Sequence, residues 1–526
     1  MNRTTLRCFA AMVAMALAPC TPAGAQEITL AYGSAVTSID PLFHNLSSNI
    51  NFSLNLFDGL VEQDEHQRPA PGLATAWKAV DDTTWEFKLR PGVHFHDGST
   101  FGPEDVAASL KRVAWMPNSP SPFTIYTRAI TETIIVDPTT IRFRTAAPYP
   151  LMPVDISSIH IVQRLFEQAP TVDFNSGRAA VGTGPYKFVS YTAGGRLVLA
   201  RNDDYWGAKP AWAKASLRII PNNPSRIATL LAGDVQGIDN VPPSDMARLE
   251  NDANVSVVRT LSNTVMFIHL DQFRDQTPDV TDKSGAPLPK NPFKDRRVRQ
   301  AISKAINREA LVEHVMEGAA HPAGALLAEG FFGVSPNTKP EKYDPDAARR
   351  LLAEAGYPNG FVMTIHGPND RYINDEKLLQ AVAPMLIRVG IETKVVALPW
   401  AVFIAQASNP NYAYSSILIG NGATTGEMSF PLRAQVATVN AATGMGASNR
   451  SRYSNPEVDA LLAKAMATVD DAKRDLLLQQ TSEVAMADQA LVPLFYGDDV
   501  YALRKGFSYV PRPDGYMAAF MVRPAN

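Results

Sequence analysis

The chain has 526 residues, of which 45% are hydrophobic and 19% are charged, and its formal net charge is −3. This hydrophobic fraction excludes a disordered chain, and the length predicts two or three domains because single cores stop growing below this size. The slightly acidic balance argues against nucleic acid or an anionic membrane surface as the partner.

The N-terminus has the pattern of a secretory signal peptide. Arg3 and Arg7 give the positive start, residues 8–18 are apolar, and Ala23-Gly24-Ala25 is a small-residue cleavage site. The apolar run is too short for a membrane anchor, since a helix needs about 20 residues to span a bilayer. We therefore expect an exported protein whose mature chain begins near Gln26.

Cys8 and Cys20 are the only cysteines, and both fall in this leader. Leu17-Ala18-Pro19-Cys20 is similar to a lipobox, which would make Cys20 a site of lipid attachment. Pro19 stands where a small Gly or Ala is expected, so plain cleavage is favoured. The mature chain is then expected to hold no disulfide, thiol nucleophile or cysteine metal site.

The first elements after the leader are a strand and a polar segment. Ile28–Ala31 predicts a short apolar strand, and the turn Ser38-Ile39-Asp40-Pro41 follows it. Residues 44–51 are polar and rich in Asn and Ser.

A clearer pattern begins at Trp85. Trp85, Phe87 and Leu89 alternate with charged residues, which predicts a strand with one buried face. Pro91-Gly92 ends this strand, and a helix is predicted from Pro103 because proline is tolerated in a first turn.

This stretch resembles the signature of the family 5 extracellular solute-binding proteins, the group that includes oligopeptide-, dipeptide-, nickel- and glutathione-binding proteins of ABC importers. Residues 182–188, 298–309 and 343–360 are also similar to the family pattern. In the signature itself the resemblance is carried by Leu73-Ala74, Trp77, Trp85–Arg90, Gly92-Val93, Phe95–Gly98 and Glu104–Val106.

The resemblance implies an α/β fold with two lobes, that of a periplasmic binding protein of class II and cluster C, with an extra subdomain on the first lobe. The expected boundaries are 1–25 for the signal peptide, 26–60, 183–268 and 490–526 for the first lobe, 61–182 for the extra subdomain and 269–489 for the second lobe.

The remaining elements agree with an α/β chain. Leu217–Ile220, Ser225–Ala232 and Val235–Val241 predict a strand, a helix and a strand, the alternation typical of an α/β sheet. Apolar residues at helical spacing predict helices over residues 298–316, 344–356, 378–389 (with a kink or break at Pro384), 455–466 and 472–487.

Enzyme motifs are not found. The sequence has no Gly-x-Ser-x-Gly elbow, no His-Glu-x-x-His and no Rossmann glycine fingerprint. His94 and His96 share one face of an extended segment and are a possible metal pair, but their place in the signature favours a structural role. We expect no catalytic residues, no metal and no cofactor.

The family resemblance implies ligand-binding candidates in several segments. Asn45, Ser48 and Asn49 follow the Asp-Pro turn, where related proteins line the ligand cleft; an ordinary solvated loop is the alternative. Trp400 matches an aromatic residue that lines the cleft, with a core tryptophan as the alternative. Tyr496 lies in the segment that returns to the first lobe and is also a candidate.

Residues 419–427 depart from the peptide-binding pattern. Asn421 stands where oligopeptide and dipeptide binders carry Trp, and Thr424 replaces the Asp that pairs with the peptide ammonium. Thr424-Thr425-Gly426-Glu427 is instead similar to the Ser/Thr-Thr-Gly-Glu segment of glutathione-binding relatives. Glu427 is therefore a candidate for the counter-charge, with a helix N-terminal acid as the alternative.

These observations predict the periplasmic solute-binding component of an ABC importer, with peptides as the first expected ligand and hinge closure as the mechanism. Glutathione, an opine, an oligosaccharide or a nickel chelate are alternative ligands, and a periplasmic enzyme or chaperone on the same fold is the alternative of another class. The expected partners are two transmembrane permease subunits with two ATP-binding subunits, and a monomer is expected.

Overall fold

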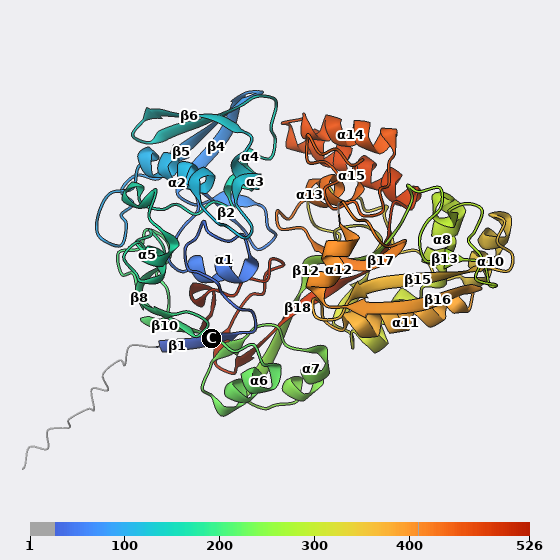
Figure 1. The fold of residues 1–526 in the computed structure, drawn as a ribbon. Coiled ribbons are helices and arrows are strands. Elements are labelled where there is room, and N and C mark those ends of the chain that lie inside the picture. Colours follow the sequence, from blue (N-terminus) through green and yellow to red (C-terminus); the bar gives the residue numbers. More distant parts are fainter. Residues whose placement is uncertain (1–26, 409, 526) are drawn as a thin grey trace, which may run out of the picture.

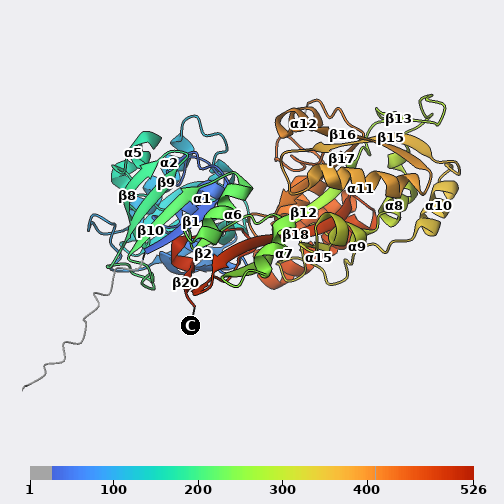
Figure 2. The ribbon, with the colours of Figure 1, turned by 90° about the horizontal axis from the view of Figure 1, so that it is seen from below.

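The computed structural model describes residues 27–408 and 410–525. Over these ranges the chain forms two lobes that share one curled, 12-stranded mixed sheet (Figures 1 and 2). The predicted signal peptide and Cys20 lie outside the described residues. In order across the sheet the strands are β13 (Val280–Thr281), β15 (Phe361–Pro368), β17 (Ser416–Gly422), β12 (Val255–Leu270), β18 (Val492–Arg504), β11 (Gly237–Ile238), β1 (Glu27–Tyr32), β10 (Lys214–Ile219), β9 (Arg196–Arg201) and β8 (Tyr186–Thr192), with β16 (Ile391–Leu398) beside β15 and β14 (Ala320–Pro322) beside β18.

Two long antiparallel strands, β12 and β18, run from one lobe into the other (Figure 2). Their pairing is regular up to Leu261 opposite Asp498, is interrupted, and resumes at Val265 opposite Tyr496. On one side of this interruption the strands pack against α6 (Asn223–Ala232) and α7 (Pro243–Glu250) of the first lobe, and on the other side they enter the cores of the second lobe. The predicted domain boundaries stay a prediction, but the connection between lobes is this strand pair.

The central part of the first lobe is a βαβ arrangement. β10 and β11 both pair in parallel with β1, and α6 connects them. Gly233 ends α6 with a φ of 86°, a conformation that favours glycine. The alternation predicted for residues 217–241 is thus confirmed, although the second strand is shorter than expected and covers only Gly237–Ile238.

A smaller sheet makes the extra subdomain of the first lobe. Trp85, Phe87 and Leu89 are buried in it as predicted, and Glu86 is buried too because Arg142 of the neighbouring strand pairs with it at 2.7 Å. The strand order is β4 (Ala74–Asp81), β5 (Thr84–Leu89), β7 (Thr140–Thr145) and β6 (Ile130–Asp137), covered by α2 (Pro103–Trp115), and the other elements of the first lobe are α1 (Ser47–Ser53), β2 (Val61–Gln63), β3 (Pro69–Pro71), α3 (Thr124–Thr127), α4 (Met152–Ile156) and α5 (Thr171–Asn175).

His96 joins this subdomain to the turn at residues 182–184. Its Nδ1 accepts a hydrogen bond from the Gly182 amide at 3.2 Å, and its Nε2 donates to the Gly184 carbonyl at 3.0 Å. Burial lowers the pKa of His96 to about 4, so the ring is neutral. These two hydrogen bonds fit the structural role expected for this histidine. No cluster of metal-ligating side chains occurs within the described ranges.

The second lobe carries most of the predicted helices. The segment 298–316 is not one helix, because Asn307 caps a new turn with a hydrogen bond from Ala310 at 3.1 Å. The helix through Pro384 does not break, since the proline lies in its last turn and little of the helix follows it. The helices are α8 (Arg296–Ala305), α9 (Arg308–Ala310), α10 (Pro345–Glu354), α11 (Asp375–Ile387), α12 (Trp400–Ala407), α13 (Ser429–Pro431), α14 (Pro456–Met466) and α15 (Asp471–Ala487).

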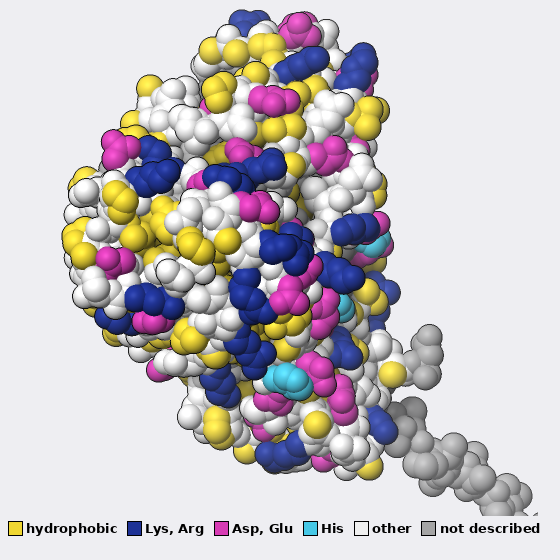
Figure 3. All heavy atoms as spheres, turned by 90° about the vertical axis from the view of Figure 1, so that its right-hand side faces the viewer, with side chains coloured by type: hydrophobic (Ala, Val, Ile, Leu, Met, Phe, Trp, Pro, Cys, Tyr) yellow, Lys and Arg dark blue, Asp and Glu magenta, His cyan; other side chains and the backbone are white. Residues whose placement is uncertain are grey.

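The outer face of the second lobe carries acidic and basic side chains in close mixture (Figure 3). Nucleic-acid binding would favour one broad basic patch, and the charges on this face do not form one. None of the described helices is long and apolar enough to cross a membrane.

Candidate functional site

A cleft compartment of about 460 Å³ lies where the two lobes meet. The first lobe contributes the residues after β1, the start of α1 and the C-terminal segment around Asp514. The second lobe contributes the approach to α11 and the end of β17. Residues 262–264, where the pairing of β12 and β18 is interrupted, also line this compartment. A ligand bound here touches both lobes and their connection.

The first-lobe wall of the cleft compartment is acidic. Asp239 accepts hydrogen bonds from the Gly33 amide at 2.7 Å and from Asn240 at 3.0 Å, and burial raises its pKa to about 6. Burial, together with neighbouring carboxylates, raises the pKa of Asp499 to about 7. Asp514 pairs with Arg512 at 2.5 Å and Asp239 lies 3.8 Å from Arg226 Nε, whereas Asp499 forms no ion pair with any described residue. Of the three carboxyl groups on this wall, Asp499 is therefore the one left to pair with a bound cation.

The second-lobe wall presents an arginine. The exposed Arg371 guanidinium lies 5.2 Å from the ring centre of Trp400 and makes no ion pair with any described residue. Asp375 at the start of α11 holds this segment, because one of its oxygens accepts hydrogen bonds from the amides of Arg371 and Tyr372 at 3.0 Å each. The cleft compartment therefore has acids on one lobe and a free cation on the other.

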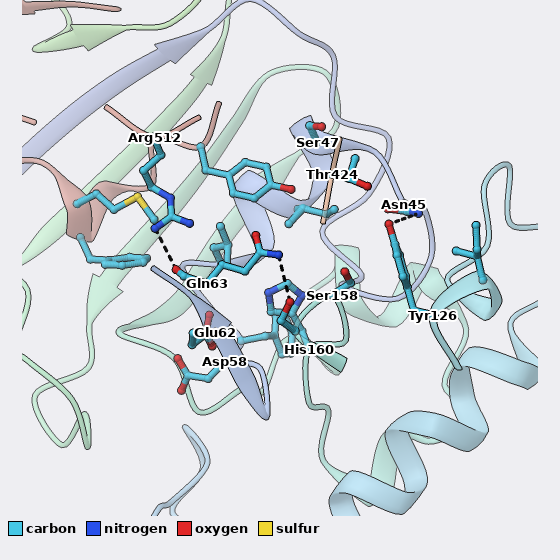
Figure 4. A pocket seen from close by; sticks show the side chains of 18 of the residues that line it. Asn45, Ser47, Asp58, Glu62, Gln63, Tyr126, Ser158, His160, Thr424 and Arg512 are labelled. Atoms are coloured by element: carbon cyan, nitrogen blue, oxygen red, sulfur yellow. Dashed lines mark hydrogen bonds between the residues drawn. The ribbon is translucent and has the colours of Figure 1, made fainter. Parts of the chain in front are cut away.

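A second cavity, which we call the inner compartment, extends from the cleft into the first lobe and has a volume of about 350 Å³. The two compartments share Ser47, Thr424 and Tyr516 as lining residues. Figure 4 shows Asp58 and Glu62 at the end of the inner compartment away from Ser47 and Thr424. Thr424 belongs to the second lobe, and its carbonyl accepts a hydrogen bond from Gln67 of the first lobe at 3.4 Å.

Three of the predicted site residues line these compartments. Asn45 lines the inner compartment and donates a hydrogen bond to the Tyr126 hydroxyl at 3.3 Å (Figure 4). Ser48 lines the cleft compartment and donates to the Ala35 carbonyl at 2.7 Å. Thr424 lines both compartments. The structure therefore brings together candidates from segments almost 400 positions apart.

Asn49 and Tyr496 are buried structural residues. Asn49 donates to the Thr37 hydroxyl at 2.8 Å and to the Ser38 carbonyl at 3.0 Å, so it holds the preceding turn. The Tyr496 hydroxyl contacts the carbonyl oxygens of Ala325 and Leu327 at 3.0 and 3.1 Å inside the second lobe. Neither lines a compartment, which corrects their prediction as ligand-binding residues.

The other candidates lie in the second lobe behind its cleft surface. Asn421 accepts a hydrogen bond from Gln435 at 2.9 Å, and Thr425 is buried. Trp400 packs against Phe403 and Tyr372 at the start of α12 and contributes to the cleft only as the surface beside Arg371. The core alternative for Trp400 fits this packing better than direct lining.

Glu427 does not face the cleft. Its side chain is 4% exposed, and Arg474 Nη1 lies 2.7 and 2.8 Å from its two oxygens. The interpretation of Glu427 as a counter-charge for the ligand is therefore corrected, because its charge is already used inside the second lobe.

Asp239, Asp499, Arg371 and the 512–516 segment were not predicted as site residues. One signal was available for Asp499: Asp498 and Asp499 interrupt an otherwise apolar strand, and buried charges in a strand point to a special role. The other residues lie in loops, where residue type alone gave no indication.

A cleft between two α/β lobes, lined by both and crossed by a pair of connecting strands, defines a two-lobe solute-binding protein. Residues 68–442 match the family described as bacterial extracellular solute-binding proteins, family 5 Middle. The chain belongs to this family, and its members are binding proteins. The α/β two-lobe fold class that the signature implied is confirmed.

Individual relatives agree with this assignment. The glutathione-binding protein GsiB of Pectobacterium atrosepticum is 29% identical over 471 residues, 88% of this chain and 87% of that protein. GsiB of Escherichia coli K12 is 28% identical over 489 residues, 92% and 91% of the two chains. The structure of HbpA2 from Haemophilus parasuis superposes with a TM-score of 0.81 at 22% identity, covering 95% and 100% of the two chains.

A further solved structure is similar in fold. It is the ABC transporter-associated periplasmic binding protein DppA from Helicobacter pylori in complex with the peptide STSA. Its TM-score is 0.74 at 24% identity, and the match covers 95% of this chain and 98% of that one. At this level of identity the likeness concerns the fold alone.

Proposed function

We propose that this protein is the periplasmic solute-binding component of an ABC importer and that its ligand is a short peptide or a peptide-like zwitterion. The observation that carries the proposal is the charge arrangement of the cleft compartment. Asp499 on the first-lobe wall suits a ligand ammonium, and Arg371 on the second-lobe wall suits a ligand carboxylate.

The charges of the cleft compartment compensate for the absence of an acidic residue at position 424. A buried ammonium without a counter-charge costs several kcal/mol, so a peptide binder without that acid needs another carboxylate. Asp499 lines the cleft from the crossing strand β18 and provides one. The sequence relatives named as glutathione-binding proteins favour glutathione, itself a small peptide-like zwitterion, as a specific candidate.

Closure follows from contacts on opposite lobes. A ligand that bridges Asp499 and Arg371 has more favourable contacts when the lobes approach, so it stabilises the closed state by its differential affinity. The closed form then docks on two permease subunits that work with two ATP-binding subunits, and the binding protein acts as a monomer. It releases its ligand chemically unchanged.

Calorimetry on the purified mature protein tests the proposal. A tripeptide pool and glutathione are titrated beside an opine, an oligosaccharide and a nickel–histidine chelate. Binding of peptides or glutathione, with loss of affinity after N-acetylation or C-amidation, supports the proposal. Binding of only the sugar or the nickel chelate contradicts it, and turnover of a bound compound would favour the enzyme alternative.

A further inference from the structure

We propose that the inner compartment receives a basic side chain of the ligand, with Glu62 as its counter-charge. This inference rests on the proposed peptide-binding function and specifies the ligand class as short peptides that carry a lysine- or arginine-type side chain.

The first argument is a pair of acidic groups without a contacting cation. Asp58 accepts hydrogen bonds from Tyr205, Trp206 and Thr183 at 3.1, 2.7 and 2.8 Å, so both its oxygens are occupied. Glu62 accepts only the Gly59 amide, at 2.6 Å on Oε1, and no described group donates to its Oε2. A donor entering the compartment can therefore reach Glu62 without displacing a protein hydrogen bond.

The nearby arginines already interact with other groups. Arg512 pairs with Asp514 at 2.5 Å and donates to the Gln63 carbonyl at 3.1 Å (Figure 4). Arg90 stacks over the Trp206 ring at 4.4 Å and donates to the Gly72 carbonyl at 3.2 Å. Neither guanidinium forms an ion pair with Asp58 or Glu62, so the negative end of the compartment has room for a positive group from outside.

The walls suit the stem of a long basic side chain. Phe57, Tyr205, Trp206 and Phe520 line the compartment and offer apolar surface for methylene groups. Aromatic rings next to carboxylates also attract ammonium and guanidinium groups through their negative faces.

His160 supplies an independent indication of a ligand. It lines the compartment, is 2% exposed, and its Nδ1 has no hydrogen-bond partner within the described chain. Burial lowers the pKa of His160 to about 4, so the ring is uncharged and does not repel a cation. A bound molecule can provide the missing partner once the ring turns its Nδ1 toward the cavity.

The position of the compartment fits a peptide side chain. It joins the cleft compartment at Ser47, Thr424 and Tyr516, so a ligand whose backbone lies in the cleft can direct one side chain past these residues. The ligand backbone is then held between the two lobes, and the basic group is held inside the first lobe.

Glu62 also gives the proposal a distinctive signature. Burial and the neighbouring Asp58 raise the pKa of Glu62 to about 8, so without a ligand the Glu62 carboxyl is largely protonated at neutral pH. A cation that pairs with the carboxylate expels this proton. Binding of a basic peptide therefore releases protons, and its affinity rises with pH through the range in which Glu62 ionises.

The experiment compares alanine tripeptides that carry one lysine, at each of the three positions, with matched norleucine peptides. Calorimetry is run on the wild type, Glu62→Gln and the control Glu65→Gln. Glu65 is exposed on the turn between β2 and β3, so this control changes the same charge outside the compartment.

We expect the wild type and Glu65→Gln to bind the lysine peptide about tenfold more tightly than the norleucine peptide at one position, with proton release seen as buffer-dependent enthalpy. Glu62→Gln is expected to lose both the preference and the proton release while it still binds the norleucine peptide. Equal wild-type affinities, or a preference that survives in Glu62→Gln, would overturn the inference. If neither these tripeptides nor glutathione binds, the proposed function itself fails; if glutathione binds and no lysine peptide is preferred, only this inference fails.

Discussion

Arg474 binds both carboxylate oxygens of Glu427 through one nitrogen, at 2.7 and 2.8 Å, with both side chains 4% exposed. The pair joins the loop after β17 to helix α15, which lies nearly 50 residues further along the chain. Glu427 is therefore part of the framework that supports the cleft surface of the second lobe.

Glu427→Gln is expected to lower stability and leave binding almost unchanged. The variant leaves the buried Arg474 without its main partner, and breaking a buried pair in this way costs about 3 kcal/mol. Urea unfolding measures the loss, and calorimetry should give a dissociation constant within about threefold of the wild type. Asp471→Asn removes the exposed second partner of Arg474 and should cost under about 1 kcal/mol. A loss of affinity above tenfold for a stable Glu427→Gln protein would return Glu427 to the site.

Asp499 predicts a pH dependence of ligand binding. Its pKa of about 7 in the free protein means that it ionises as the pH rises through neutrality, while a ligand α-ammonium stays charged up to about pH 8. Affinity for an amine-bearing peptide should therefore increase between about pH 6 and pH 8. Asp499→Asn should weaken binding by about tenfold at pH 8 and flatten this profile. Asp498→Asn, which changes the adjacent charge outside the cleft lining, should keep the rise in affinity but move it to lower pH, because Asp498 helps to raise the pKa of Asp499. An unchanged profile in Asp499→Asn would exclude this carboxylate as the ammonium partner.

Arg371 predicts a dependence on the ligand carboxylate. Arg371→Gln should weaken binding of a peptide with a free C-terminus by about tenfold and have little effect on the matching C-terminal amide. Arg388→Gln is the control, since it removes an exposed charge just beyond the far end of α11. Fluorescence or calorimetric titration of both peptides measures the effect. Equal losses for acid and amide would show that Arg371 does not bind the carboxylate.

Gly182 predicts a stability effect unrelated to binding. A Cβ at this position would lie 1.9 Å from the Leu56 carbonyl oxygen, so Gly182→Ala forces backbone to move and should cost about 2 kcal/mol. Gly497→Ala is the matched control, because its Cβ would meet no atom within 4 Å. Thermal unfolding compares the two variants. Equal unfolding temperatures would contradict the close approach of the turn to Leu56.

Local features of the fold were predictable because their causes are local. Asp344 and Asn455 accept hydrogen bonds from the first turns of α10 and α14, and the prolines that follow them occupy first-turn positions, as their sequence indicates. The broken segment 298–316 shows the limit of periodicity, because α8 ends at Ala305 and the capping side chain of Asn307 starts a new turn while the apolar spacing continues.

The site was less predictable because its geometry depends on partners far apart in sequence. Nothing near Glu427 indicates that Arg474 will neutralise it. The segment from Arg512 to Tyr516 has no regular structure, and its position is fixed by long-range contacts such as the hydrogen bond from the Tyr32 hydroxyl to the Met517 carbonyl at 2.6 Å. Such contacts follow from the packed first lobe, not from residue order.

The interruption between β12 and β18 lies inside the binding surface. Ser262, Asn263 and Thr264 lie where the ladder between the strands is lost, and all three line the cleft compartment. If the lobes rotate about this interruption, a small rotation at these residues displaces the distant rim of a lobe by a much larger amount. A ligand that contacts these residues therefore acts directly on this rotation. Substitutions at these three positions should alter the rate at which the lobes open as much as the affinity for the ligand.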